Sequence, residues 1–243
     1  MKDILQDIVS HTHNLGFLNI VKITGTDETT KIDSMADDRT VVMFGETASP
    51  QPEMIGVFGM PQLNKLKYNL ECPEYKEDAT IDLMTADRNG EITPIGLHFE
   101  NKAGDFKNDY RFMTSEVISD KLKSVKMKNV KWNVEITPTV ASIQKLKYQS
   151  QANSEENNFI VKTEGNKLKF FFGDHSSHAG DFVFADGVTG TLTKSWPWPV
   201  GVVISILALP GDKTMRFSDE GVAQITVDSG IATYNYLLPA QSK

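Results

Sequence analysis

The chain has 243 residues, of which 40% are hydrophobic and 23% are charged, and its formal net charge is −7. A globular protein of this length buries a substantial core and has room for two domains of about 120 residues each. No apolar run approaches the ~20 residues of a membrane span, and the single cysteine, Cys72, excludes an internal disulfide and a cysteine-based zinc site. The first residues lack the pattern of a signal peptide, so we expect a soluble cytoplasmic protein without a membrane partner.

The first half of the chain alternates helical and strand patterns. Residues 3–15 carry apolar side chains at helical spacing and are followed by a glycine. A second helix is expected after Pro61, where Leu63, Leu66 and Leu70 form one apolar stripe. The segments with strand composition in this half are 17–23, 40–44, 79–85, 92–100 and 109–114.

A third helix is predicted in the second half, which repeats the order of the first. Thr137 and Pro138 suit the N-cap and the first position of this helix. The helical spacing then turns Val140, Ile143 and Leu146 inward.

Strand patterns dominate the rest of the chain. The Trp-Pro-Trp-Pro segment at 196–199 predicts a turn in place of a clean fourth helix, and the β-branched run 200–209 predicts a buried strand. The other expected strands are 159–163, 167–172, 181–185, 190–194, 214–218 and the two arms of a hairpin at 224–238. The repeated order of elements predicts an internally duplicated α+β protein with many antiparallel strands.

One short string occurs twice, as Lys65-Leu66-Lys67-Tyr68 and as Lys145-Leu146-Lys147-Tyr148. At about 100° per residue, burial of the leucine stripe leaves an Asn or Gln, a lysine and a tyrosine exposed, with a second lysine on the flank. These residues are Asn64, Lys65, Lys67 and Tyr68 in the second helix and Gln144, Lys145, Lys147 and Tyr148 in the third. A solvated surface is one explanation, and a lining that contacts nucleic acid phosphates without reading sequence is the other.

The chain resembles the sliding clamps (DNA polymerase processivity factors) of T-even-like bacteriophages. The strings that carry the resemblance are Lys2-Asp3 before an amphipathic helix, 57–63, 134–137, 159–161, 167–170 and 236–239. The resemblance covers nearly the whole chain as an order of elements. It implies a DNA-clamp fold with two similar domains, residues 1–116 and 132–243, joined by a connector at 117–131, with sheets outside and helices lining the inner face.

The resemblance also implies a function. Three identical subunits would form a ring around duplex DNA, tether the replicative DNA polymerase and support phage late transcription. A clamp loader would place the ring on DNA, and the clamp itself would have neither an active site nor a cofactor. Further DNA-facing residues would be Lys2, His11, His13 and Lys194. A partner peptide would dock in an apolar pocket near Val117, Val125, Leu237, Leu238 and Pro239.

Two other classes of function stay open at this point. A phage virion structural or assembly protein would also be acidic and rich in strands. A metal-dependent enzyme would use His175 and His178, which have carboxylates nearby, although a polar hairpin loop is the preferred explanation of this segment. The chain has no Gly-rich phosphate loop, nucleophile elbow or metalloprotease motif, so we expect no enzymatic activity and no metal. The duplication and the paired lysine helices favour the clamp.

Overall fold

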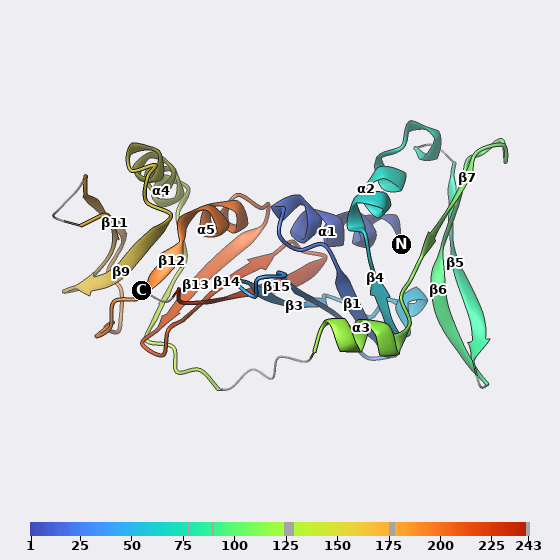
Figure 1. Ribbon diagram of the computed structural model, residues 1–243, viewed down its shortest axis with the longest axis horizontal. Coiled ribbons are helices and arrows are strands. Elements are labelled where there is room, and N and C mark those ends of the chain that lie inside the picture. Colours follow the sequence, from blue (N-terminus) through green and yellow to red (C-terminus); the bar gives the residue numbers. More distant parts are fainter. Residues whose placement is uncertain (77, 89, 124–128, 175–177, 242–243) are drawn as a thin grey trace. The chain divides into compact units, whose positions relative to one another are not determined.

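The structure is a computed structural model and describes residues 1–76, 78–88, 90–123, 129–174 and 178–241. The chain divides into two compact units (Figure 1). Unit 1 comprises Met1–Val125 and Ser229–Tyr234, and unit 2 comprises Lys126–Asp228 and Asn235–Lys243. Within the described residues, no helix is both long enough and apolar enough to cross a membrane.

Unit 1 contains two sheets and three α-helices in its described residues. The helices are α1 (Lys2–His11), α2 (Leu63–Glu71) and α3 (Ser115–Lys121). The strands are β1 (Val21–Gly25), β2 (Thr30–Met35), β3 (Val42–Thr47), β4 (Gly56–Met60), β5 (Thr80–Arg88), β6 (Glu91–Glu100) and β7 (Lys107–Arg111). The first four form an antiparallel sheet in the order β4-β1-β2-β3, and the last three form the sheet β5-β6-β7.

Helices α1 and α2 pack against each other in unit 1, and Figure 1 shows them on one side of the first sheet. Helix α3 lies on the opposite side, against β4. A Cβ atom at Gly59 of β4 would lie 2.7 Å from Ile118 Cγ1 of α3, so the glycine allows this close approach. Helix α3 was not anticipated within the predicted joining segment.

In its described residues, unit 2 contains two helices, a four-stranded sheet and a second group of four paired strands. The helices are α4 (Val140–Ala152) and α5 (Val200–Leu207). The strands are β8 (Val134–Ile136), β9 (Asn158–Glu164), β10 (Lys167–Phe172), β11 (Gly180–Asp186), β12 (Pro197–Pro199), β13 (Asp212–Ser218), β14 (Val222–Asp228) and β15 (Ala232–Pro239), the last of which begins in unit 1. The strand orders are β11-β10-β9-β12 and β15-β14-β13-β8, and α4 packs on β11 and on α5.

The two units repeat one topology. Each has a helix, four strands, a second helix and three strands. The four strands follow the spatial order fourth-first-second-third in both cases, as β4-β1-β2-β3 and as β12-β9-β10-β11, and the three strands form a meander. The predicted α+β duplication is therefore confirmed. In this correspondence α1 matches α4 and α2 matches α5, so the two Lys-Leu-Lys-Tyr strings, on α2 and α4, lie on helices that do not correspond.

The prediction for residues 200–209 was wrong. Residues Val200–Leu207 form helix α5, which begins directly after Pro199, and its buried residues Val203, Ile206 and Leu207 follow helical spacing. This spacing was hidden because the intervening residues are also apolar. The strand predicted at 190–194 is absent from the described structure, which has no regular element there.

The start of α4 also differs from the prediction. Its N-cap is Thr139 and not Thr137, and Thr139 forms a capping box with Ser142. The Ser142 backbone N–H donates to Thr139 Oγ1 at 3.1 Å, and the Thr139 N–H donates to Ser142 Oγ at 2.9 Å. The later start leaves Val140 in the first turn, where it is 77% exposed instead of pointing inward. The predicted domain limits, 1–116 and 132–243, stay a prediction.

Candidate nucleic-acid interface

Helix α2 has the exposed face that its sequence predicts. Leu66 is fully buried, and the other stripe leucines are buried with it. Tyr68 is 82% exposed, and Asn64 and Lys65 are exposed beside it. Among the residues that the structure describes, neither the Lys65 ammonium nor the Tyr68 hydroxyl has a hydrogen-bond or ion-pair partner. The outer side of α2 therefore presents a phenol and an ammonium group to solvent.

Lys67 lies on the other flank of α2, toward the segment that follows α1. Its Nζ donates to Asn14 Oδ1 at 2.9 Å and lies 3.9 Å from Glu71 Oε1. The side chain is only about one-third exposed, in agreement with the predicted flank position. These contacts hold the Lys67 ammonium beside Asn14, just after α1. Lys65 lies instead on the flank of α2 that faces β7.

Helix α4 presents the same types of side chain. Leu146 is fully buried, Tyr148 is 71% exposed, and Gln144 and Lys145 are exposed. Lys147 is half-buried on the flank, as predicted. Among the described residues, Lys145 and Tyr148 also have no polar side-chain partner. Both Lys-Leu-Lys-Tyr strings thus bury their leucine and expose their tyrosine and first lysine.

The other predicted DNA-facing residues are not gathered on these two faces. Lys2 Nζ donates to the backbone oxygen of Tyr75 at 3.0 Å. His13 is half-buried, and its Nδ1 lies 3.3 Å from Asn19 Oδ1. Lys194 is exposed in the loop before β12, and its backbone N–H donates to Asp219 Oδ1 at 3.0 Å. Neither Lys2 nor Lys194 belongs to α2 or α4.

The placement of His11 on a DNA-facing surface was wrong. His11 is 1% exposed, and its ring stacks on Tyr234 with 4.4 Å between ring centroids and 3° between planes. Its Nδ1 lies 3.2 Å from Asp7 Oδ1 on the same helix. The histidine ends α1 as predicted, but the aromatic ring covering it comes from near the other end of the chain.

Asp7 is the centre of this buried polar cluster. The Tyr234 hydroxyl donates to Asp7 Oδ2 at 2.7 Å, and Ser229 Oγ lies 2.9 Å from the same oxygen. Burial acts to raise the pKa of Asp7, but hydrogen bonds with His11 and Tyr234 outweigh it and hold the pKa below its usual range. The cluster fastens α1 to the turn before β15, within unit 1.

A polar groove of about 580 Å³ runs between α2 and β7. Lys65 and Tyr68 line it from α2, and Asp109 and Arg111 line it from β7. Asp109 Oδ1 lies 2.7 Å from His98 Nδ1, and this hydrogen bond, followed by that to Glu100, raises the pKa of His98. The exposed side of α2 therefore extends to a charged sheet edge.

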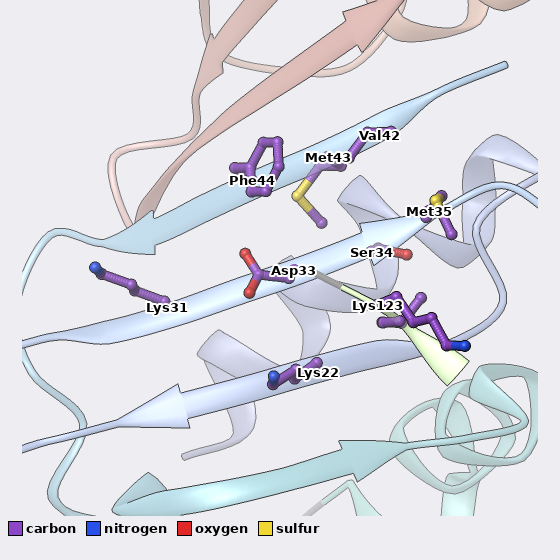
Figure 2. A pocket seen from close by; sticks show the side chains of 10 residues that line it. Lys22, Lys31, Asp33, Ser34, Met35, Val42, Met43, Phe44 and Lys123 are labelled. Carbon is purple, nitrogen blue, oxygen red and sulfur yellow. The ribbon is translucent and has the colours of Figure 1, made fainter. Parts of the chain in front are cut away.

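A second, more apolar groove lies on the face of the first sheet that α3 covers in part (Figure 2). Its volume is about 240 Å³, and its lining is Lys22, Lys31, Asp33, Ser34, Met35, Val42, Met43, Phe44, Leu122 and Lys123. Cross-strand pairing aligns Asp33 with Lys22 on one side and Phe44 on the other. Burial raises the pKa of Asp33, and the charges of Lys22 and Lys31 act against this rise. The groove combines apolar side chains with a lysine rim.

None of the described residues predicted for a peptide pocket lines this groove. Val117 is 46% exposed on α3, and Val125 lies outside the described residues. Leu237 and Leu238 are 7% and 0% exposed, because both side chains belong to the core, and only Pro239 is exposed. The sequence thus indicated the neighbourhood of α3 but missed the strand residues, which come together only through the register of β1, β2 and β3.

The histidine segment offers no metal site in the part of the chain that the structure describes. His175 lies outside the described residues, and His178 is exposed just before β11. No group of three or more His, Cys, Asp or Glu side chains among the described residues is placed to hold a metal ion.

Comparison with solved structures identifies the fold. The chain is similar to A. fulgidus PCNA bound to the C-terminal region of FEN-1, with a TM-score of 0.72, 9% identity and coverage of 100% of this chain and 97% of the other. It is also similar to PCNA from Thermococcus kodakaraensis (TM-score 0.68, 12% identity, 98% and 96% coverage) and to the PCNA2-PCNA3 complex from Sulfolobus tokodaii (0.67, 13%, 98% and 96%). No family model and no curated protein sequence matches. The chain therefore has the PCNA-type clamp fold, as predicted, over its whole length.

Proposed function

We propose that the protein is a sliding clamp, a non-enzymatic ring of three copies that encloses duplex DNA in the cytoplasm of a phage-infected cell. In this role it tethers a replicative DNA polymerase, is placed on DNA by a clamp loader and supports late transcription. The observation that carries the proposal is the duplicated clamp topology, which matches PCNA structures over nearly the full length of both chains.

The free strand edges support assembly into a ring. Strand β3 is the third of the four strands in unit 1, and β15 is the third strand of the last meander. In the duplicated topology their counterparts are β11 and β7, and each of these has one strand neighbour within the described residues. Unpaired edges are sites where another chain adds by backbone hydrogen bonding. Pairing β7 of one copy with β11 of the next is a head-to-tail contact, which gives a closed ring when the rotation between copies closes.

The exposed faces of α2 and α4 support contact with DNA. Their lysines are suited to phosphates, and phosphate contacts hold a duplex without reading its sequence, as sliding requires. The net charge of −7 disfavours binding of nucleic acid over the whole surface, so local lysines on two helices define where DNA is held.

The groove beside α3 supports binding of partner peptides. Met35, Phe44 and Leu122 offer apolar contacts, and Lys22, Lys31 and Lys123 form a basic rim. This lining fits a peptide with apolar anchors and acidic flanks, such as a tail of the polymerase. The A. fulgidus PCNA structure contains a C-terminal region of FEN-1.

The first test is the mass in solution, measured by light scattering. We expect about three times the subunit mass of 27.1 kDa. A large open-ended assembly indifferent to duplex DNA would instead identify a virion structural protein.

The second test measures binding to duplex DNA with the double variant Lys65→Glu and Lys145→Glu, which should weaken retention without unfolding. The matched control is Lys76→Glu with Lys167→Glu, which makes the same charge change at exposed lysines outside both helices. Equal retention by both double variants would refute the assignment of the lining.

A further inference from the structure

Strand β5 has a strand neighbour on one side only, within the part of the chain that the structure describes. It is the first strand of the sheet β5-β6-β7 and pairs with β6 (Figure 1). Residues 80–84 form a regular antiparallel ladder with β6, and the register shifts only after Met84. The strand contains neither proline nor lysine, which commonly block pairing at a sheet edge. The first half of β5 is therefore able to pair with a further strand.

The repeated topology shows where such a strand would lie. One helix followed by three strands occurs four times, beginning at α1, α2, α4 and α5. A short strand precedes three of these helices, namely β4, β8 and β12. Each of them pairs with the first strand of the other repeat in its unit, β4 with β1, β12 with β9 and β8 with β13. Strand β5 is the remaining first strand, and no strand of the described residues takes this place beside it.

The burial of side chains along β5 agrees with an unoccupied place beside it. Ile81 and Leu83 face inward, opposite buried residues of β6, yet both are only half-buried. On β13, which has β8 beside it, the inward-facing Met215 and Phe217 are each 1% exposed. A strand with apolar side chains on its inner face would therefore remove further apolar surface of β5 from water.

Asp82 is the charged residue in the regular part of β5. It is exposed and lies on the face opposite Ile81 and Leu83, directly across from a residue of β6. Among the described residues Asp82 has no hydrogen-bond or ion-pair partner. The other carboxylates on this face of the sheet are paired, Glu100 with Lys107 and Asp109 with Arg111. Asp82 therefore leaves one negative charge at the edge.

Unit 2 shows how a charge at this position is used. Arg216 of β13 lies directly across from Glu135 of β8, and its Nε donates to Glu135 Oε2 at 2.9 Å. The acidic member of this pair is on the added strand, β8. On β5 the sign is reversed, because Asp82 is acidic, so the complementary strand would carry a lysine or an arginine.

A second copy of the chain is a poor occupant of this edge. Two β5 strands paired antiparallel and centred on Asp82 would place two carboxylates directly opposite each other, which destabilises strand pairing. Opposite charges in the same positions stabilise it. The edge therefore disfavours pairing with itself and favours a basic strand.

We propose that β5 accepts an extended, basic segment of a partner protein as an added antiparallel strand, in the place that β8 takes beside β13. Backbone groups of the segment pair with those of β5, and its alternate apolar side chains cover Ile81 and Leu83. A lysine or arginine of the segment lies opposite Asp82. The site belongs to unit 1 alone, so it does not depend on a ring or on the faces of α2 and α4.

A synthetic peptide tests the site. The probe is Thr-Val-Lys-Ile-Thr flanked by serines, and the control peptide has glutamate in place of the lysine. Hydrogen exchange of the backbone amides of residues 80–84 is followed by NMR. At a concentration of ten times its Kd, the probe should slow the exchange of the outward-facing amides about tenfold. It should also bind about fivefold more tightly than the glutamate peptide.

Charge variants of the protein test the role of Asp82. Asp82→Lys should reverse the preference between the two peptides, and Asp82→Asn should remove it. The matched control is Asp27→Lys, which makes the same charge change in an exposed turn and should keep the preference of the wild type. A probe that is N-methylated at every residue, and so cannot donate backbone hydrogen bonds, should not bind.

Two results would overturn the proposal. One is unchanged exchange of the β5 amides at millimolar probe. The other is an equal affinity for the lysine and glutamate peptides in the wild type. Either result together with a trimeric mass would overturn this site alone, because assembly of the proposed ring does not use β5.

Discussion

Substitution of Asp7 by asparagine should destabilise unit 1 in a pH-dependent manner. The Asp7 carboxylate is about one-tenth exposed and accepts a hydrogen bond from Tyr234 at 2.7 Å, with Ser229 Oγ at 2.9 Å and His11 Nδ1 at 3.2 Å. These contacts join α1 to the turn that precedes β15. Asparagine has nearly the same shape but no charge, so the variant removes the charge-assisted part of each hydrogen bond.

The expected cost follows from these contacts. A hydrogen bond to a charged group contributes about 1.5–3 kcal/mol, whereas a neutral one contributes about 1 kcal/mol. Asparagine keeps one acceptor oxygen, so Asp7→Asn should lower the free energy of unfolding by about 2 kcal/mol at neutral pH. Because the pKa of Asp7 is lowered in the folded protein, its contribution is complete above the unfolded pKa, near 3.9, and is lost as the pH falls through the folded value.

Urea unfolding followed by circular dichroism measures this effect. The unfolding midpoints at an unchanged slope give the free-energy difference between wild type and variant at neutral pH and at a pH below the folded pKa. Asp3→Asn is the matched control, since Asp3 is exposed on the same helix. The reasoning is refuted if Asp7→Asn costs no more than Asp3→Asn, or if its cost is the same at both pH values.

Three further predictions concern the packing of helices and are checked by the same unfolding measurement. Leu66→Ala should cost about 2–5 kcal/mol, because the side chain is fully buried beneath α2. Thr139→Ala should cost about 1 kcal/mol by removing the capping box of α4, and an unchanged midpoint would contradict the cap. Gly59→Ala should cost about 1–3 kcal/mol, because its Cβ would lie 2.7 Å from Ile118, whereas Gly201→Ala in α5, with nothing within 4 Å, should stabilise by about 0.5 kcal/mol.

The faces of α2 and α4 could be predicted because their determinants are local. A leucine stripe at helical spacing fixes which side of a helix is buried, so the exposure of Tyr68 and Tyr148 follows from a few neighbouring residues. The same reasoning failed for α5, where apolar residues occupy both faces and β-branched side chains favour a strand by composition. Helix α5 packs on α4, and composition alone does not distinguish this segment from a strand.

Features assembled from distant segments could not be predicted. The apolar groove depends on the register that aligns Lys22, Asp33 and Phe44 across three strands. The burial of His11 depends on Tyr234, which is far from it in the sequence but belongs to the same unit. In both cases the residues themselves are ordinary for an exposed strand or a helix end, and only the long-range pairing gives them their environment.

The position of the repeated Lys-Leu-Lys-Tyr string does not follow from the duplicated fold. Topology relates α2 to α5, but α5 has no charged residue, while α2 shares its exposed Lys and Tyr with the unrelated α4. Descent from one ancestral unit would have placed the string on corresponding helices. The two helices that carry it each pack on a strand that ends its sheet among the described residues, α2 on β7 and α4 on β11.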